Sequence, residues 1–419
     1  MYKKNLAAVM TSVIFTASLV GCSGGNGNRI ASNDGFVDNS VALSYSTGIK
    51  DKGYMGFVFD SMGKCCEGNK DQNVMISPAS VLFALSLVES GASGNTLDEM
   101  SSVLVPGTTG GEALGFASSY YKYLVNIPKN NLRIANGVFV NDDSNVRLYQ
   151  KYIDFVSESF DAEVDTKRFN NKAVKEINEW VDEKTEGMIP GVLTSLDPND
   201  VAVLINTITF EASWVKPYGE NSILPNETFT TSGGMEQNVT MLDGYEGKYY
   251  ETDKAIAFAK HYAYGGYKFL AILPKDESIS ANEFIADFDV SDYEELMESE
   301  AIAQVFTRIP EFSYDYSNTD IKGILQSLGM NEVFSSDADL SNMCEGEMFL
   351  SEVIHKTHIE VDREGTKAAA VTAGTISQSA SIPPEETVYI YLDRPFAYMI
   401  VDKMTDTPVF IGTVNSVTK

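Results

Sequence analysis

The uncharged segment 368–384 most constrains how this chain can fold. Charged residues make up 21% of the sequence, yet none occurs in this segment. Apolar patterns typical of β-strands precede it at 355–361 and follow it at 388–392. Loops of this length are usually functional or disordered, but this one lacks the enrichment in Pro, Glu and Lys that solvated linkers show. We interpret it as a bait loop whose small side chains allow it to insert into a sheet.

Composition indicates a large acidic globular protein. The chain has 419 residues, of which 43% are hydrophobic, enough for the core of one large or two medium domains. Its formal charge of −28 disfavours binding to nucleic acid or to anionic membrane surfaces. The simplest interpretation of this charge is an acidic, soluble surface. The negative electrostatic field around such a surface would also attract a cationic partner.

The N-terminus has the pattern of an export signal. Two lysines precede an apolar run at 6–20, which is too short for a stable membrane span, so we expect a signal peptide over residues 1–21. The run ends in a motif similar to a bacterial lipobox, which would make Cys22 the lipidated first residue of the mature protein. An ordinary secretory signal cut nearby is the alternative. Residues 22–45, rich in Gly, Asn and Ser, are expected to form a flexible tether.

Both alternatives predict a bacterial protein that is secreted or held at the cell surface. Contact with a membrane would then occur only through a lipid anchor. The remaining Cys65, Cys66 and Cys344 are too few for a disulfide framework. Three histidines give no spacing typical of a zinc site, so we expect neither a metal nor another cofactor.

Hydrophobic periodicity predicts one mixed α/β domain over residues 46–419. Ser77 suits a helix N-cap and Pro78 suits the first helical position, ahead of an apolar helix that should be buried. Helices are also expected at 53–62, 97–104, 147–160, 172–185 and 320–328, with further helical periods over 281–303. Strands are expected at 132–140, 200–210, within 236–273, and at 388–392, 396–402 and 409–415.

Six collinear stretches resemble the serpin family. They are Asn73…Ser77-Pro78-Ala79-Ser80, Asn178…Thr185-Glu186-Gly187-Met188-Ile189, Asn206…Phe210…Trp214, His355…Glu364-Gly365-Thr366…Ala368-Ala369-Ala370, Asp393-Arg394-Pro395-Phe396 and Phe410-Ile411-Gly412. Each stretch is weak alone, but all six occur in the family's order and at its spacings. The resemblance implies three β-sheets with a large central sheet that can open, eight or nine helices, and an exposed reactive centre loop over about 363–386.

The resemblance also implies roles for particular residues. The shutter region, where the central strands part, would contain Ser77, Ser80, Asn206 and His355. The hinge of the loop would contain Glu364, Gly365, Thr366, Ala368, Ala369 and Ala370. Alternation along the strand places His355 on the apolar side with 357, 359 and 361, where a neutral imidazole needs hydrogen-bond partners. Without the resemblance, His355 would be interpreted as a core histidine.

A serpin inhibits by being cut: the protease forms an acyl-enzyme, and the freed loop inserts into the central sheet and distorts the protease. Insertion from Thr366 would turn alternate residues inward, and every inward residue through Ile376 is small or apolar. Lys367, the one charge, would face solvent. This pattern favours an inhibitory serpin. Arg363 and Lys367 depart from the glutamates that the family often has at these positions.

The resemblance places the reactive bond at Ser379–Ala380, with Ala380–Ser381 as the alternative. No basic, acidic or large aromatic residue lies between Ala368 and Pro384, which disfavours trypsin-like proteases, caspases and chymotrypsin-like proteases. The expected partner is therefore a serine protease with a small specificity pocket, elastase-like or subtilisin-like. The expected form of the inhibitor is a monomer.

Two other functions compete with inhibition. A non-inhibitory serpin acting as a surface binding or substrate-like module is the main alternative. A serine hydrolase is disfavoured because the sequence has no Gly-x-Ser-x-Gly elbow and only three histidines, so the chain is not expected to be an enzyme.

Overall fold

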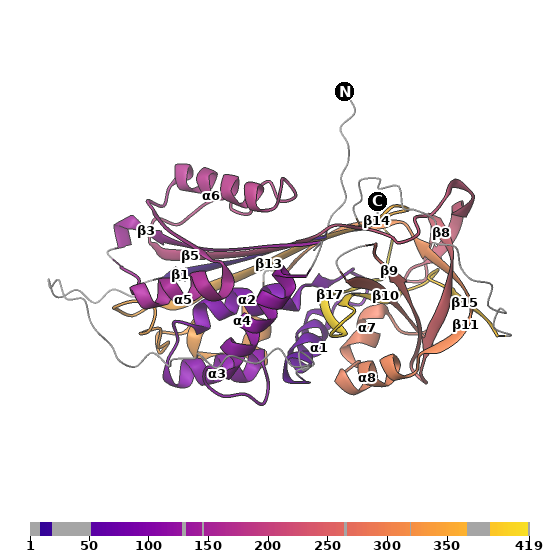
Figure 1. Cartoon of the computed structure of the whole chain (residues 1–419), viewed down its shortest axis with the longest axis horizontal. Helices are drawn as coiled ribbons and strands as arrows, with labels where there is room; N and C mark the ends of the chain where they lie inside the picture. The colour runs from indigo at the N-terminus through magenta and orange to yellow at the C-terminus, as the bar shows by residue number, and fades with distance from the viewer. Residues whose placement is uncertain are drawn as a thin grey trace, which may run out of the picture.

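A long six-stranded sheet crosses the middle of the molecule, with helix α6 on one face and most other helices on the opposite face (Figure 1). This computed structural model describes residues 9–18, 52–127, 131–144, 146–263, 266–318, 320–366 and 386–417. The helices in this part of the chain are α1 (Lys52–Cys66), α2 (Pro78–Glu89), α3 (Gly94–Leu104), α4 (Glu112–Val125), α5 (Gln150–Phe160), α6 (Asn171–Lys184), α7 (Ala281–Ala286), α8 (Val290–Glu298) and α9 (Ile321–Ser327).

The six-stranded sheet has the strand order β12-β13-β1-β5-β3-β4. Its strands are β1 (Val9–Ser18), β3 (Leu132–Asn141), β4 (Glu163–Lys167), β5 (Asp200–Phe210), β12 (Phe312–Asn318) and β13 (Phe349–Val361). Strand β5 is buried on both faces from Val201 onward, as its continuous run of Val, Ile and Leu predicts. The central position belongs to β1, which comes from the predicted signal segment.

A second sheet has nine strands, of which eight follow the order β15-β11-β8-β9-β10-β16-β17-β2 while β7 pairs with β8. Its strands are β2 (Met75–Ile76), β7 (Ile223–Thr230), β8 (Glu236–Glu251), β9 (Ala255–His261), β10 (Tyr267–Pro274), β11 (Ala301–Pro310), β15 (Thr387–Tyr391), β16 (Phe396–Asp402) and β17 (Thr407–Val414). The 16-residue β8 joins two halves, because most of it pairs with β7 and β11 while Tyr250 and Glu251 pair with β9. A third sheet consists of β6 (Ala212–Ser213) and β14 (Gly365–Thr366).

Most predicted elements are present within a few residues of the expected bounds. Helix α2 begins as expected, since the Ser77 side chain accepts a hydrogen bond from the backbone N–H of Ser80 and Pro78 opens the helix. Every residue of α2 is buried, which confirms the prediction from its apolar surface. The expected mixed α/β class, with three sheets and nine helices in the described part of the chain, is also confirmed.

The segment 281–303, where helical periods were expected, is helical only in part. It forms two short helices and then enters β11 at Ala301. Two capping boxes account for the break: Ser280 with Glu283 starts α7, and Asp289 with Asp292 starts α8. Several elements were not predicted at all, among them helix α4 and strands β4, β6, β7, β11 and β12.

Candidate functional site

Strand β1 fills a position between β5 and β13 and is antiparallel to both. Its register places Val13 opposite His355 of β13 and opposite Asn206 of β5. Strands β5 and β13 are therefore parallel to each other, and only an antiparallel strand between them repeats this pairing. We call this place the insertion position. It accepts ten consecutive residues, Val9–Ser18.

The chain that leaves β13 turns back toward the insertion position at once. One carboxylate oxygen of Asp362 accepts hydrogen bonds from the backbone N–H groups of Glu364 (2.8 Å) and Gly365 (3.0 Å). The backbone N–H of Asp362 donates in turn to the Gly365 carbonyl at 3.0 Å. This role of Asp362 was not predicted, although Asp three residues before Gly is a common turn signal.

Gly365 is required by the close approach of two backbones. A Cβ atom at this position would lie 2.1 Å from the Ala212 carbonyl oxygen, far inside van der Waals contact. Its φ of +156° is also a conformation that side chains disfavour. Strand β14 can therefore pair with β6 only with glycine here, which fixes the direction in which the loop starts.

Thr366 is completely buried at the start of the loop. Its hydroxyl is 2.7 Å from the Tyr262 hydroxyl. The Tyr262 ring stacks on Trp214 with 4.5 Å between ring centroids, and the Trp214 indole N–H donates to the Asp362 carbonyl at 3.0 Å. The first inward-facing residue of the predicted register thus already lies inside the protein, beside the end of β13.

The four predicted shutter residues come together in one buried hydrogen-bond network. The Ser77 hydroxyl donates to the Val409 carbonyl (2.9 Å), and the Ser77 backbone N–H donates to Nε2 of His355 (3.2 Å). The Ser80 hydroxyl donates to Oδ1 of Asn206. The network therefore links α2 to β5, β13 and β17 below the insertion position.

Asn136 of β3 belongs to the same network and was missed by the sequence analysis. Its Oδ1 accepts from Nδ2 of Asn206 at 2.7 Å, and its own Nδ2 donates to the Phe160 carbonyl at 2.7 Å. An asparagine among the apolar residues of the predicted strand 132–140 was the available signal. The network thus extends over three strands of the six-stranded sheet.

His355 is neutral in this environment. Complete burial lowers its pKa from 6.5 to about 3, and its Nε2 accepts a hydrogen bond, which an imidazolium could not do. Within the described residues its Nδ1 has no hydrogen-bond partner. The predicted inward face of β13 is confirmed, since His355, Thr357, Ile359 and Val361 are all buried.

Other predicted site residues lie outside the described residues. These are the hinge residues Ala368, Ala369 and Ala370, the reactive-bond residues Ser379, Ala380 and Ser381, and the lipidation candidate Cys22. Cys65, Cys66 and Cys344 are described; each is buried and forms no disulfide among the described residues. Across the described ranges, no helix is long and apolar enough to cross a membrane.

This geometry defines a class of protein: a sheet with a central position that takes an extra antiparallel strand, beside a loop that begins to turn into it. A sequence profile for "Serpin (serine protease inhibitor)" matches residues 52–417. The chain belongs to the serpin family, whose members are generally inhibitors of serine proteases and not catalysts.

Similar proteins come from distant organisms. An uncharacterized serpin-like protein of Thermococcus kodakarensis is 30% identical over 85% of this chain and 83% of its own length. The leukocyte elastase inhibitor of Sus scrofa is 29% identical over 86% of this chain and 97% of its own length. The native-state crystal structure of the thermophilic serpin tengpin is 33% identical, covers 87% of this chain and 94% of that chain, and has a TM-score of 0.74.

Proposed function

We propose that this chain is a suicide-substrate inhibitor of serine proteases with a small specificity pocket, elastase-like or subtilisin-like. In this mechanism the protease attacks Ser379–Ala380 (or Ala380–Ser381) and forms an acyl-enzyme. The freed loop then enters the insertion position and carries the attached protease with it. The observation that carries the proposal is that this position takes a complete antiparallel strand next to the buried Thr366.

Strand addition supplies the driving force. A central strand pairs with both neighbours, and each net hydrogen bond contributes about 1 kcal/mol, so ten residues contribute on the order of 10 kcal/mol before side-chain burial is counted. The inward residues after Thr366 are small or apolar, and they can be buried without leaving an unpaired charge. The loop sequence therefore matches the demands of the position.

In this proposal, the predicted removal of residues 1–21 is the step that makes the insertion position available to the loop. In the full chain Val9–Ser18 fills the place that the loop needs. Cleavage before Cys22 would remove β1 and leave the position open. We therefore propose that the exported protein, secreted or lipid-anchored at the bacterial surface, is the inhibitory form.

Two observations support the choice of protease. The segment 368–384 offers only small or short side chains near the bond, which suit a shallow pocket. The leukocyte elastase inhibitor among the relatives is named for a protease of this type. A charge of −28 would in addition speed the approach of a cationic elastase.

Contact between Ser77 and His355 does not make a hydrolase. The contact uses the backbone N–H of Ser77, while the Ser77 hydroxyl donates to the Val409 carbonyl. A general base must instead receive the proton of the nucleophile's own hydroxyl. This pair therefore stabilises the fold and does not activate a serine.

A gel experiment tests the proposal. The chain lacking residues 1–21 is incubated with pancreatic elastase, neutrophil elastase and subtilisin, and the products are separated under denaturing conditions. A stable complex of the summed mass supports inhibition by trapping. Cleavage with the protease still active would favour the alternative, a non-inhibitory serpin that acts as a surface binding or substrate-like module.

A further inference from the structure

A cavity lies beside β9, on the face of this strand that points away from the hinge. Its volume is about 350 Å³, and its walls come from β8, β9, the start of β10, Glu300 and Lys403. His261 and Tyr262 are consecutive residues, and side chains of consecutive strand residues point to opposite faces. Tyr262 contacts the hinge, whereas His261 lines this cavity. The cavity is therefore distinct from the insertion position.

Basic side chains gather at this cavity, although the chain as a whole is strongly acidic. Lys248, Lys268, Lys403 and His261 all line it. His261 and Lys268 are direct partners in the β9–β10 ladder, so their side chains are neighbours on one face. The formal net charge of the chain is −28, so four basic groups around one cavity are an unusual concentration of positive charge.

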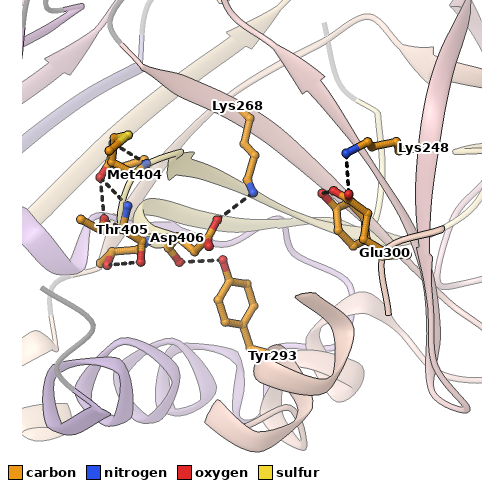
Figure 2. Close-up of polar contacts among 10 residues, drawn as sticks. Lys248, Lys268, Tyr293, Glu300, Met404, Thr405 and Asp406 are labelled. Carbon is orange, nitrogen blue, oxygen red and sulfur yellow. Dashed lines mark hydrogen bonds and ion pairs between the residues drawn. The ribbon is translucent and has the colours of Figure 1, made fainter. Parts of the chain in front are cut away.

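The acidic side chains at the cavity are already engaged. Glu300 accepts a hydrogen bond from Lys248 at 2.5 Å (Figure 2). It also accepts one from the Tyr250 hydroxyl at 3.1 Å. Glu246 lies 3.5 Å from the ammonium of the buried Lys260, behind the cavity wall. These two carboxylates are therefore paired with Lys248 and Lys260, and they offset the remaining cations only in part.

Lys268 is held in place from behind the cavity. Its ammonium is 2.9 Å from Asp406, whose backbone carbonyl accepts from the Tyr293 hydroxyl at 2.8 Å (Figure 2). The Lys268 side chain is only 8% exposed, so its charge acts in a partly desolvated setting. Its position is thus fixed before any ligand arrives.

Among the described residues, neither the Lys403 ammonium nor the His261 imidazole forms a hydrogen bond or an ion pair within 4 Å, although Asp402 acts on Lys403 and Glu300 acts on His261 through their charges. The neighbouring Asp402 acts on Lys403 only through its charge, while Oδ2 of its carboxylate accepts from the Tyr123 hydroxyl (2.9 Å) and from the backbone and hydroxyl of Thr405 (3.1 and 2.5 Å). One ammonium and one imidazole therefore face the cavity with their hydrogen-bonding capacity unused.

We propose that this cavity binds a small ligand through a tetrahedral oxyanion, a phosphate or sulfate group, held by Lys403, His261 and Lys268. Charge-assisted hydrogen bonds from such a cluster to anionic oxygens are stronger than neutral ones. The cavity is at the size at which small-molecule pockets begin, and it leaves room for a sugar-sized group attached to the anion. This site does not rest on the inhibitory function.

Local electrostatics agree with an anion site. The pKa of His261 is lowered, first by partial removal from water and then by the charges of Lys403, Lys268 and Lys248, while Glu300 opposes them. The pKa of Lys403 is also lowered, first by burial, with Asp402 acting against it and Lys268 adding to it. A bound dianion would reverse both effects.

Isothermal titration calorimetry on the full chain tests the proposal, with inorganic phosphate, inorganic sulfate and glucose 6-phosphate as probes. Ionic strength is held constant with sodium chloride at pH 7.5. Saturable binding of at least one probe is expected. Lys403→Met should raise its Kd at least tenfold, which corresponds to about 1.4 kcal/mol, and Lys403→Arg should restore most of the affinity.

Lys175→Met is the matched control. It removes the same charge from α6, where the Lys175 side chain is 76% exposed and lies 3.5 Å from Glu179. Its Kd should stay within twofold of the wild-type value. If the wild type shows no saturable heat, or if Lys175→Met weakens binding as much as Lys403→Met, the site does not exist.

Two further arms define the ligand and the role of His261. Tighter binding of glucose 6-phosphate than of phosphate would identify a phosphate ester as the ligand, and equal binding would identify the free anion. The charge of sulfate does not change between pH 5.5 and pH 7.5. Sulfate should bind more tightly at pH 5.5, because protonation of His261 adds a positive charge to the cavity. The other charged groups that line the cavity are Lys248, Lys268, Lys403, Glu246 and Glu300. His261→Gln should remove that pH dependence, and a wild type without it would exclude His261 from the site.

Discussion

Thr366→Arg should convert the inhibitor into a substrate. Thr366 is fully buried and its hydroxyl is 2.7 Å from the Tyr262 hydroxyl, so the substitution removes a hydrogen bond that contributes about 1 kcal/mol. In the uncleaved protein the charged side chain of Thr366→Arg should leave this buried place for solvent, so insertion from the hinge would have to bury an unpaired cation at a cost of several kcal/mol. The cost of burying the charge, about 4 kcal/mol, arises on insertion and slows it about a thousandfold, since each 1.36 kcal/mol is a factor of ten.

Slower insertion lets the protease hydrolyse the acyl-enzyme first. The assay titrates a fixed amount of subtilisin or elastase with the chain lacking residues 1–21 and measures how many inhibitor molecules are consumed for each protease inactivated. We expect about one for the wild type and more than ten for Thr366→Arg, with loop cleavage unimpaired. Thr366→Val, which keeps shape without charge, should remain close to the wild type. Equal trapping by Thr366→Arg would refute the insertion register, whereas a wild type that traps nothing would refute inhibition itself.

Three further predictions concern the insertion position, the shutter and the core. The full chain should trap far less protease in the same titration than the chain lacking residues 1–21, because β1 occupies the insertion position; equal trapping would show that β1 leaves readily. Because His355 titrates at about 3 when folded and near 6.5 when unfolded, its contribution to stability is complete above pH 6.5 and falls by up to about 1.4 kcal/mol per pH unit below that value. Thermal unfolding from pH 7 to pH 4 should therefore decline more steeply in the wild type than in His355→Gln, and parallel curves would contradict the depressed pKa. Gly412→Ala should lower the unfolding temperature by several degrees, since a Cβ there would lie 2.4 Å from the Tyr398 hydroxyl oxygen, whereas Gly219→Ala, with open space around it, should have little effect.

Regular elements of this protein could be predicted from local pattern. Ser77, Pro78 and the apolar run after them predict helix α2. The alternation of inward-facing and outward-facing residues after His355 predicts strand β13. In both cases one short stretch contains the cap or the period that determines the structure. The shutter network was also accessible, because buried serine and asparagine side chains must find partners.

Features that depend on contacts between distant segments could not be predicted from local sequence patterns. Gly365 is required by the Ala212 carbonyl, which no property of the loop sequence reveals. The cavity at Lys403 assembles from strands that are far apart in the chain. Strand β1 was interpreted only as a signal segment, because an apolar run rich in Val, Ile and Thr serves equally well for export and for a central strand.

Strand β1 also links the order of synthesis to the folded state that is reached. Val9–Ser18 is among the first segments to leave the ribosome, yet its two partners are Asp200–Phe210 and Phe349–Val361. The ladder with β5 cannot close until residue 210 exists, and the ladder with β13 must wait until residue 358 exists; contacts so distant in sequence form slowly. If export removes the leader before residue 361 joins the sheet, the domain must fold with its central place vacant. The timing of cleavage, and not the sequence alone, would then decide which form a molecule reaches: one with an open insertion position, or one in which β1 fills that position.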